Sequence, residues 1–115
     1  MRRALIVGID DYPNCPLQGC VIDAVRLASV LERHHDGRLN FQCDVVTSKT
    51  HAITRPLLRK KIGDLFAHQA DVAFLHFSGH GTTDALGGYL VTQDFADFDV
   101  GIWAAAGFKD TQLGV

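Results

Sequence analysis

Three short apolar runs, separated by segments with helical periodicity, constrain the fold of this chain more than any other feature. The runs are Ala4 to Ile9, Phe41 to Val46 and Val72 to Phe77, and each is rich in branched or aromatic residues, as buried strands are. Between them, apolar positions recur every three or four residues, which is typical of amphipathic helices. Strands that alternate with helices of this length form parallel crossovers, so we predict a three-layer α/β sandwich with a mostly parallel sheet.

The two helical segments have recognisable ends. The first begins at Cys20 and runs to about His34, and the second begins near Thr54, a good N-cap with Pro56 in the first turn, and ends near Gln69. The apolar positions of the first are Val21, Ala24, Val25, Ala28 and Leu31, and those of the second are Leu58, Ile62, Leu65 and Phe66. Further along, residues 87–92 are predicted to form a short strand or one arm of a hairpin.

Composition and charge exclude several classes of protein. The chain has 115 residues, of which 47% are hydrophobic, and a net charge of -2, so it is one globular domain or part of one. It lacks the basic stripe of a nucleic-acid-binding protein and the ~20 consecutive apolar residues of a membrane-spanning helix, so we expect neither nucleic acid nor membrane as partner. Cys15, Cys20 and Cys43 lack CxxC spacing, which argues against a disulfide framework or a zinc ribbon and favours a reducing, cytoplasmic setting.

Unusual polar residues gather where the first and third predicted strands end. Two aspartates, at positions 10 and 11, follow the first strand, and the segment Ser78 to Gly81 follows the third. Ligands bind beyond the carboxyl ends of parallel strands, so if both of these strands are central and parallel, Asp23 and His80 face one cleft. A histidine between glycines suits a general base near neutral pH, and the neighbouring Gly81 amide is a candidate oxyanion donor.

Three segments together resemble the caspase and metacaspase superfamily of cysteine endopeptidases (peptidase C14). They are Ala4 to Tyr12, similar to the family's opening strand and turn, Leu17 to Ala24, with the pattern L-x-G-C-x-x-D-A, and Phe74 to Gly81, an apolar strand that ends in S-G-H-G. The resemblance is clearest over residues 4–94. It implies a caspase-like α/β/α sandwich, here a single partial domain over residues 1–115 in which 95–115 are unassigned.

The resemblance implies roles for five residues. His80 corresponds to the histidine of the Cys/His dyad, and the Gly81 amide to a donor of the oxyanion hole. Cys20, Asp23 and Ser78 correspond to positions that line the specificity pocket in the metacaspase branch. Because a carboxylate in a partly desolvated pocket attracts a cation, Asp23 favours cleavage after Arg or Lys, whereas caspases proper cut after Asp. Two simpler interpretations stay open, namely Cys20 as a small buried thiol and Asp23 as a stabilising acid near a helix N-terminus.

The family's nucleophilic cysteine has no counterpart in this sequence. In caspases it follows a fourth core strand about 50 residues after the histidine, which corresponds to a position near ~130, beyond Val115. Cys15 and Cys20 follow the first strand, and Cys43 lies within the second, so none of them replaces it. We therefore expect the 115-residue chain alone to be inactive, whether it is a fragment, a frameshift product, or a split or degenerate protein.

Two functions are consistent with this pattern. The first is the N-terminal part of the large catalytic subunit of a metacaspase-type cysteine endopeptidase, which acts on peptide or protein substrates and needs no cofactor. The second is a non-catalytic caspase-like module or split-protease half, which associates with itself or with a complementing half through an open sheet edge. A nucleotide-binding domain is disfavoured, because no G-x-G-x-x-G follows the first strand.

One acidic segment leaves a cofactor question open. Asp94, Asp97 and Asp99 are either an ordinary solvated loop, which we favour, or a calcium-responsive cluster, because many metacaspases are activated by calcium. Their spacing differs from that of an EF-hand loop.

Overall fold

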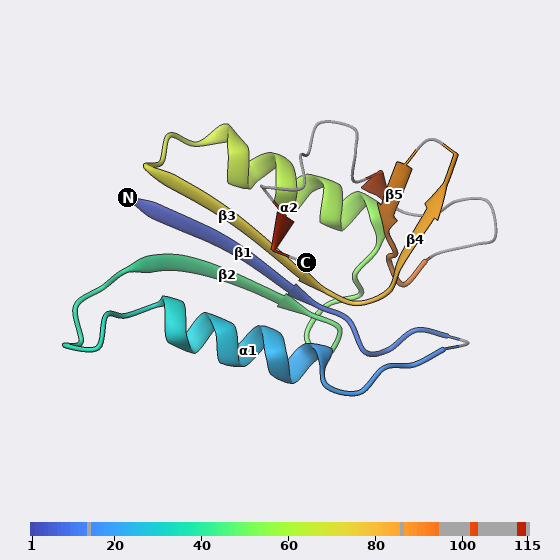
Figure 1. Ribbon diagram of the computed structural model, residues 1–115, viewed down its shortest axis with the longest axis horizontal. Helices are drawn as coiled ribbons and strands as arrows, with labels where there is room; N and C mark the ends of the chain where they lie inside the picture. Colours follow the sequence, from blue (N-terminus) through green and yellow to red (C-terminus); the bar gives the residue numbers. More distant parts are fainter. Residues whose placement is uncertain (14, 86, 95–101, 104–112, 115) are drawn as a thin grey trace.

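The computed structural model describes residues 1–13, 15–85, 87–94, 102–103 and 113–114 (Figure 1). Its elements, in chain order, are β1 (Arg2–Gly8), α1 (Cys20–Leu31), β2 (Phe41–Thr47), α2 (Arg55–Ala67), β3 (Val72–Ser78), β4 (Gly81–Asp84), β5 (Gly87–Leu90), β6 (Ile102–Trp103) and β7 (Leu113–Gly114). Within the described part of the chain, no helix is long and apolar enough to cross a membrane.

The main sheet is parallel and has the strand order β2-β1-β3-β7. β1 is central and pairs along its whole length, from Arg2 to Gly8, with β2 on one side and β3 on the other. β7 lies on the far side of β3 and pairs with it at Leu75 and His76. The predicted strands and their parallel crossovers are confirmed.

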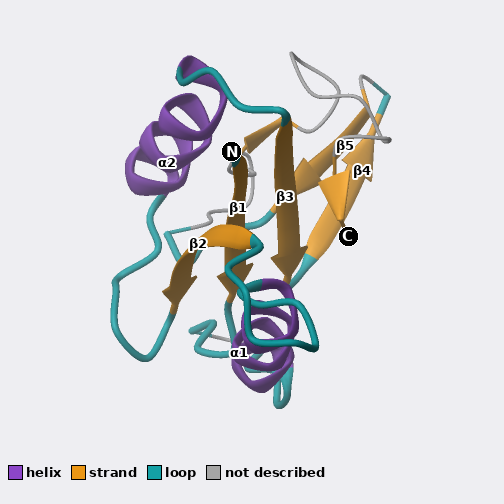
Figure 2. Cartoon of the chain, turned by 90° about the vertical axis from the view of Figure 1, so that its left-hand side faces the viewer, coloured by secondary structure: helices purple, strands orange, loops and turns teal. Residues whose placement is uncertain are grey.

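One helix covers each face of this sheet (Figure 2). Successive side chains of a strand point to opposite faces, so β1 contributes to two separate clusters. On one face, α2 packs on β1 and β3, with Leu58, Ile62 and Leu65 against Leu5, Val7, Leu75 and Phe77. On the other face, α1 packs Ala24 and Ala28 against Ala4 and Ile6. The three-layer α/β/α prediction is therefore confirmed.

Gly8 determines how closely α1 approaches the sheet. A Cβ at this position would lie 2.6 Å from the Cys20 carbonyl oxygen and 2.9 Å from the Ala24 Cβ. Only glycine leaves room for the first turn of α1 to pack against the end of β1. The start of α1 is thereby held at the carboxyl edge of the sheet.

The helices begin where the sequence predicts, and α2 has the expected cap. Thr54 accepts a hydrogen bond from the Leu57 N–H at 3.3 Å, and Pro56 lies in the first turn. The first helix ends at Leu31 instead of His34, because the chain turns back there and the Asn40 N–H donates to the Glu32 carbonyl at 2.8 Å.

Two side chains that the sequence assigns to buried helix faces are exposed. Val25 is 52% exposed and Phe66 is 38% exposed, so both assignments are wrong. Each follows directly after a buried residue of the same helix, Ala24 or Leu65. One residue corresponds to a rotation of about 100° around a helix, which carries the side chain out of a narrow apolar stripe.

A small antiparallel sheet follows β3. β4 and β5 form a hairpin in which Gly81 lies opposite Leu90 and Asp84 opposite Gly87, and β6 pairs with β5. The segment predicted as a strand or hairpin arm is therefore the second arm of this hairpin. It brings Val91 back toward the end of β3.

Candidate functional site

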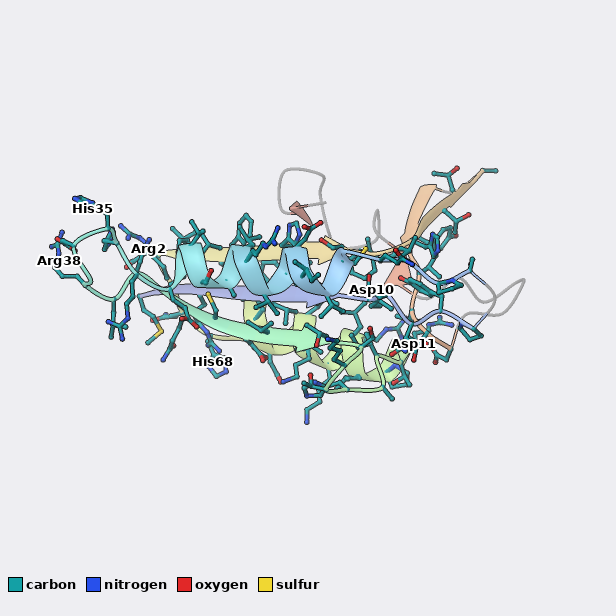
Figure 3. All side chains as sticks on the ribbon, turned by 90° about the horizontal axis from the view of Figure 1, so that it is seen from below. Arg2, Asp10, Asp11, His35, Arg38 and His68 are labelled. Atoms are coloured by element: carbon teal, nitrogen blue, oxygen red, sulfur yellow. The ribbon has the colours of Figure 1, made fainter. Side chains whose placement is uncertain are left out.

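The candidate site lies where β1 and β3 end side by side. Gly8 is opposite Ser78 in the parallel register, and the Ile9 N–H donates to the Ser78 carbonyl at 2.9 Å. Asp10 and Asp11 therefore lie at the carboxyl edge of the sheet, near the start of α1, with His35 at the opposite end of the molecule (Figure 3). β1 and β3 are the two central strands of the parallel sheet, which is the condition under which Asp23 and His80 are expected to face one cleft.

Asp10 caps the N-terminus of α1. Its carboxylate accepts hydrogen bonds from the Cys20 N–H at 2.8 Å and from the Val21 N–H at 3.3 Å. The N-cap residue is Gly19, whose φ of 115° favours glycine and which has no side chain to cap the helix. Asp23 lies exposed in the first turn, where its charge also faces the positive end of the helix dipole. The capping role of Asp10 could not be predicted from the sequence, because a whole loop separates this residue from the helix.

The cap gives a first testable prediction. We expect Asp10→Asn to lower the free energy of unfolding by about 1 kcal/mol, because the amide keeps one acceptor and loses the charge that faces the helix dipole. Asp11→Asn is the matched control, because Asp11 is the exposed neighbour and should change stability by less than about 0.5 kcal/mol. Urea denaturation measures both, and equal losses for the two variants would argue against the capping role.

Tyr12 connects the loop after β1 with the hairpin. Its side chain is buried, and its hydroxyl donates to the Val91 carbonyl at 2.8 Å and accepts from the His80 N–H at 3.0 Å. The Val91 N–H in turn donates to the His80 carbonyl at 3.0 Å. In an antiparallel ladder, such a pair exchanges two direct bonds. Here the Tyr12 hydroxyl replaces one of these two direct bonds, because it lies between the His80 N–H and the Val91 carbonyl and bonds to both.

Gly79 makes the insertion of Tyr12 sterically feasible. A Cβ on Gly79 would lie 2.5 Å from the Tyr12 hydroxyl and 2.9 Å from the ring of Phe77. Burial, with a smaller contribution from the negative charges of neighbouring groups such as Asp10, raises the pKa of Tyr12 to about 12. The hydroxyl therefore keeps its proton at neutral pH and can donate to Val91.

His80 is held by its backbone and by its ring. The imidazole packs on the ring of Tyr12, with centroids 4.6 Å apart, and its Nε2 lies 2.8 Å from the Cys15 carbonyl oxygen. A carbonyl only accepts hydrogen bonds, so Nε2 is assigned the proton, and Nδ1 carries the lone pair of the neutral ring. Among the described residues, no hydrogen bond to Nδ1 occurs. This nitrogen is therefore placed to accept a proton from another group.

Gly81 lies next to His80 at the first position of β4. Because the His80–Val91 pair is of the hydrogen-bonded type, the adjacent Gly81–Leu90 pair is of the other type. The Gly81 N–H is therefore directed away from β5. The role of this amide as an oxyanion donor stays a prediction.

The three predicted pocket residues reach the same edge of the sheet. Cys20 and Asp23 belong to the first turn of α1, and Ser78 is the last residue of β3. The Ser78 hydroxyl is 2.7 Å from Nε2 of His76, two residues earlier on the same face of β3. Gly8, opposite Ser78 and against Cys20, connects the two elements. Their role in binding substrate stays a prediction.

The surroundings of two of the three cysteines disfavour the thiolate. Burial, and then the charge of Asp10, raises the pKa of the Cys20 thiol. Burial, and then Glu32, raises the pKa of the Cys43 thiol, which lies on β2. The reactive form of cysteine is the thiolate, which these environments disfavour. Cys15 is exposed, and it contacts His80 through its backbone carbonyl.

Asp94 has a structural role in the described part of the chain. Its carboxylate accepts hydrogen bonds from the Arg55 N–H at 3.0 and 3.3 Å, and these bonds cap α2. It also accepts a hydrogen bond from the Thr92 hydroxyl at 2.6 Å. Asp97 and Asp99 lie outside the described residues. Within those residues, no group of three or more His, Cys, Asp or Glu side chains is arranged to hold a metal ion. Calcium activation stays a prediction.

The fold and the site together define a class of protein. A parallel α/β/α sandwich that presents a glycine-flanked histidine at the carboxyl edge of its sheet is the architecture expected of caspase-like domains. The model of the caspase domain family (peptidase C14) matches residues 1–113, and the chain belongs to this family. The resemblance that the sequence motifs indicate is confirmed.

The chain is similar in sequence to two plant proteins over most of its length. The chain is 35% identical to metacaspase-7 of Arabidopsis thaliana over 88 residues, which are 70% of this chain and 21% of that protein. It is 35% identical to metacaspase-6 of the same plant over 86 residues, which are 70% of this chain and 23% of that protein. The chain therefore spans about a fifth of the length of these curated relatives.

Proposed function

We propose that this chain is the histidine-bearing part of a metacaspase-type cysteine endopeptidase domain, with His80 as its general base. The observation that carries the proposal is the hydrogen bond from Nε2 of His80 to the Cys15 carbonyl. This bond fixes the tautomer in which Nδ1 is free to accept a proton from a thiol. The inserted Tyr12 hydroxyl holds the backbone of the same residue.

The proposed reaction uses a cysteine that is not one of the three in this chain. Nδ1 of His80 takes the thiol proton, the thiolate attacks the scissile carbonyl, and the Gly81 N–H donates to the oxygen that becomes negative. The imidazolium then protonates the leaving amine, and water hydrolyses the acyl-enzyme. The Cys15 carbonyl supports the imidazolium, because it accepts the Nε2–H throughout.

The position of β7 supports a specific route for this cysteine. β7 runs parallel to β3, with Gly114 opposite His76. Because β7 is parallel to β3, it is directed toward the end of β3 that precedes His80. We therefore place the nucleophile on polypeptide that extends the sheet beside β3.

The charges near the site favour a basic residue before the cleaved bond. The carboxylate of Asp10 is occupied by the N-terminal amides of α1, whereas that of Asp23 is exposed one turn further along. An exposed carboxylate also attracts a cation and rejects an anion, although more weakly than one in the partly desolvated pocket that the sequence predicts. The proposal therefore includes cleavage after Arg or Lys, with Asp23 as the recognising group.

Fluorogenic peptides that end in Arg, Lys or Asp test this function. In the complete protein, His80→Ala is expected to lower kcat/KM for Arg peptides by at least about 100-fold. His68→Ala is the matched control, because His68 is an exposed residue at the end of α2, and it should have no effect. Asp23→Asn should reduce the preference for Arg over Asp.

The 115-residue chain is expected to show no turnover by itself. Turnover that His80→Ala abolishes would mean that one of its own cysteines is the nucleophile, which contradicts the proposal. The chain alone also permits a direct test of His80, because ring nitrogen NMR distinguishes the two neutral tautomers. A protonated Nδ1 in the neutral ring would contradict the assignment of His80 as base.

A further inference from the structure

β2 forms one edge of the main sheet. Of the described strands, only β1 pairs with it. The end of β2 is buried, and the Thr47 carbonyl accepts a hydrogen bond from the His51 N–H of the following loop at 2.9 Å. The preceding stretch, Phe41 to Val45, is exposed or half-buried. The backbone groups on the outer side of such a strand are a template for pairing with another strand.

Two cavities flank this same stretch of β2. The first, of about 400 Å³, lies toward α2, and its charged lining residues are Arg3, Asp44, Lys61 and Asp64. The second, of about 310 Å³, lies toward α1 and is lined by Glu32, Arg33, Leu39 and Phe41. Gln42 and Cys43 border both cavities. Because side chains alternate along a strand, a strand added beside β2 would place side chains in each cavity in turn.

The side chains of β2 are complementary to a second copy of β2. In an antiparallel pair with Cys43 opposite Cys43 of the second copy, Phe41 lies opposite Val45, which is a favourable aromatic and β-branched pair. Gln42 lies opposite Asp44, so that an amide N–H meets a carboxylate. In the alternative register centred on Asp44, the Asp44 side chains of the two copies lie opposite each other, and their like charges oppose pairing. Charge therefore disfavours the register centred on Asp44 and is compatible with the register centred on Cys43.

We infer that this chain self-associates through antiparallel pairing of the Phe41–Val45 stretches of two copies, which joins their sheets across a two-fold axis. Asp44 also forms an ion pair with Lys61 at 3.0 Å, which reduces the cost of bringing its charge into the interface. A contact over one short strand is small, so the dimer is weak and depends on concentration. The inference is independent of the proposed protease function.

Substitution of Gln42 tests the register. Gln42 is exposed and lies opposite Asp44 twice in each dimer, so Gln42→Lys creates two opposite-charge pairs and Gln42→Glu creates two like-charge pairs. Each is expected to change the dissociation constant about 2- to 30-fold, Gln42→Lys downward and Gln42→Glu upward. Sedimentation equilibrium over a concentration series measures this. Equal constants for the two variants, or a monomer at every concentration, would overturn the inference.

Cys43 gives a second measurement. Opposed Cα atoms in an antiparallel pair are about 4.5–5.5 Å apart, within the range that a disulfide spans. Copper phenanthroline with dioxygen takes two electrons from the two thiols, whose protons go to solvent, and it should produce a covalent dimer on a non-reducing gel. Cys43→Ser should abolish this product, whereas Cys15→Ser should retain it. The reverse result would place the contact elsewhere and overturn the inference.

Discussion

Replacing Gly79 with Ala is expected to cause a large loss of stability. The new Cβ would lie 2.5 Å from the Tyr12 hydroxyl and 2.9 Å from the ring of Phe77. Both side chains are buried, so neither can move away cheaply. Overpacking, and the hydrogen bonds of Tyr12 that a displacement would break, together cost about 2–4 kcal/mol.

Gly63→Ala is the matched control for this substitution. Gly63 lies within α2, and apart from its two chain neighbours and the backbone of its own helix, no described atom lies within 4 Å of the position that a Cβ would occupy. Alanine is a better helix former than glycine by about 1 kcal/mol, so the same chemical change should stabilise the protein there. Chemical denaturation therefore measures two effects of opposite sign. A Gly79→Ala variant as stable as the parent would show that Tyr12 is not fixed against the His80 loop.

The fold could be predicted from local patterns because its strands and helices are encoded locally. The run from Val72 to Phe77 and the periodicity after Cys20 are sufficient to indicate a buried strand and an amphipathic helix. The N-cap Thr54 also works within a single turn. Each of these features depends on residues that are close in the sequence, so local patterns are sufficient to predict it.

The groups that fix the site could not be predicted in this way. Asp10 caps a helix that begins ten residues later, Asp94 caps α2 across 39 residues, and Tyr12 meets Val91 across 79 residues. No local rule connects such pairs, because the topology of the sheet brings them together. The motif around His80 could be recognised, but the tautomer of its ring depends on the Cys15 carbonyl, which is 65 residues away.

Tyr12→Phe is expected to destabilise the protein by about 2–4 kcal/mol, although it removes a single oxygen atom. The substitution leaves the His80 N–H and the Val91 carbonyl without the hydroxyl that bridges them. Each unsatisfied buried group costs about 1–3 kcal/mol. The ring of Phe still occupies the gap, so the two backbone groups cannot close to form a direct bond. The same change should alter the His80 ring resonances, and under the proposed function it should also lower kcat.

The ionisation of Tyr12 provides an independent check of this burial. The chain has two tyrosines, so Tyr89→Phe leaves Tyr12 as the sole source of tyrosinate absorbance. Because the pKa is raised from 10.0 to about 12, that absorbance should appear only as the pH approaches 12. Between these values, the unfolded chain releases the proton of Tyr12 while the folded chain keeps it.

The stabilising contribution of Tyr12 is therefore complete below pH 10 and is lost as the pH rises through about 12. Tyr12→Phe should remove this part of the alkaline loss of stability, because phenylalanine has no proton to release. Tyrosinate formation near pH 10 in the Tyr89→Phe variant would instead mean that water reaches the Tyr12 hydroxyl. The backbone of His80 would then be held by a solvated contact instead of a buried one.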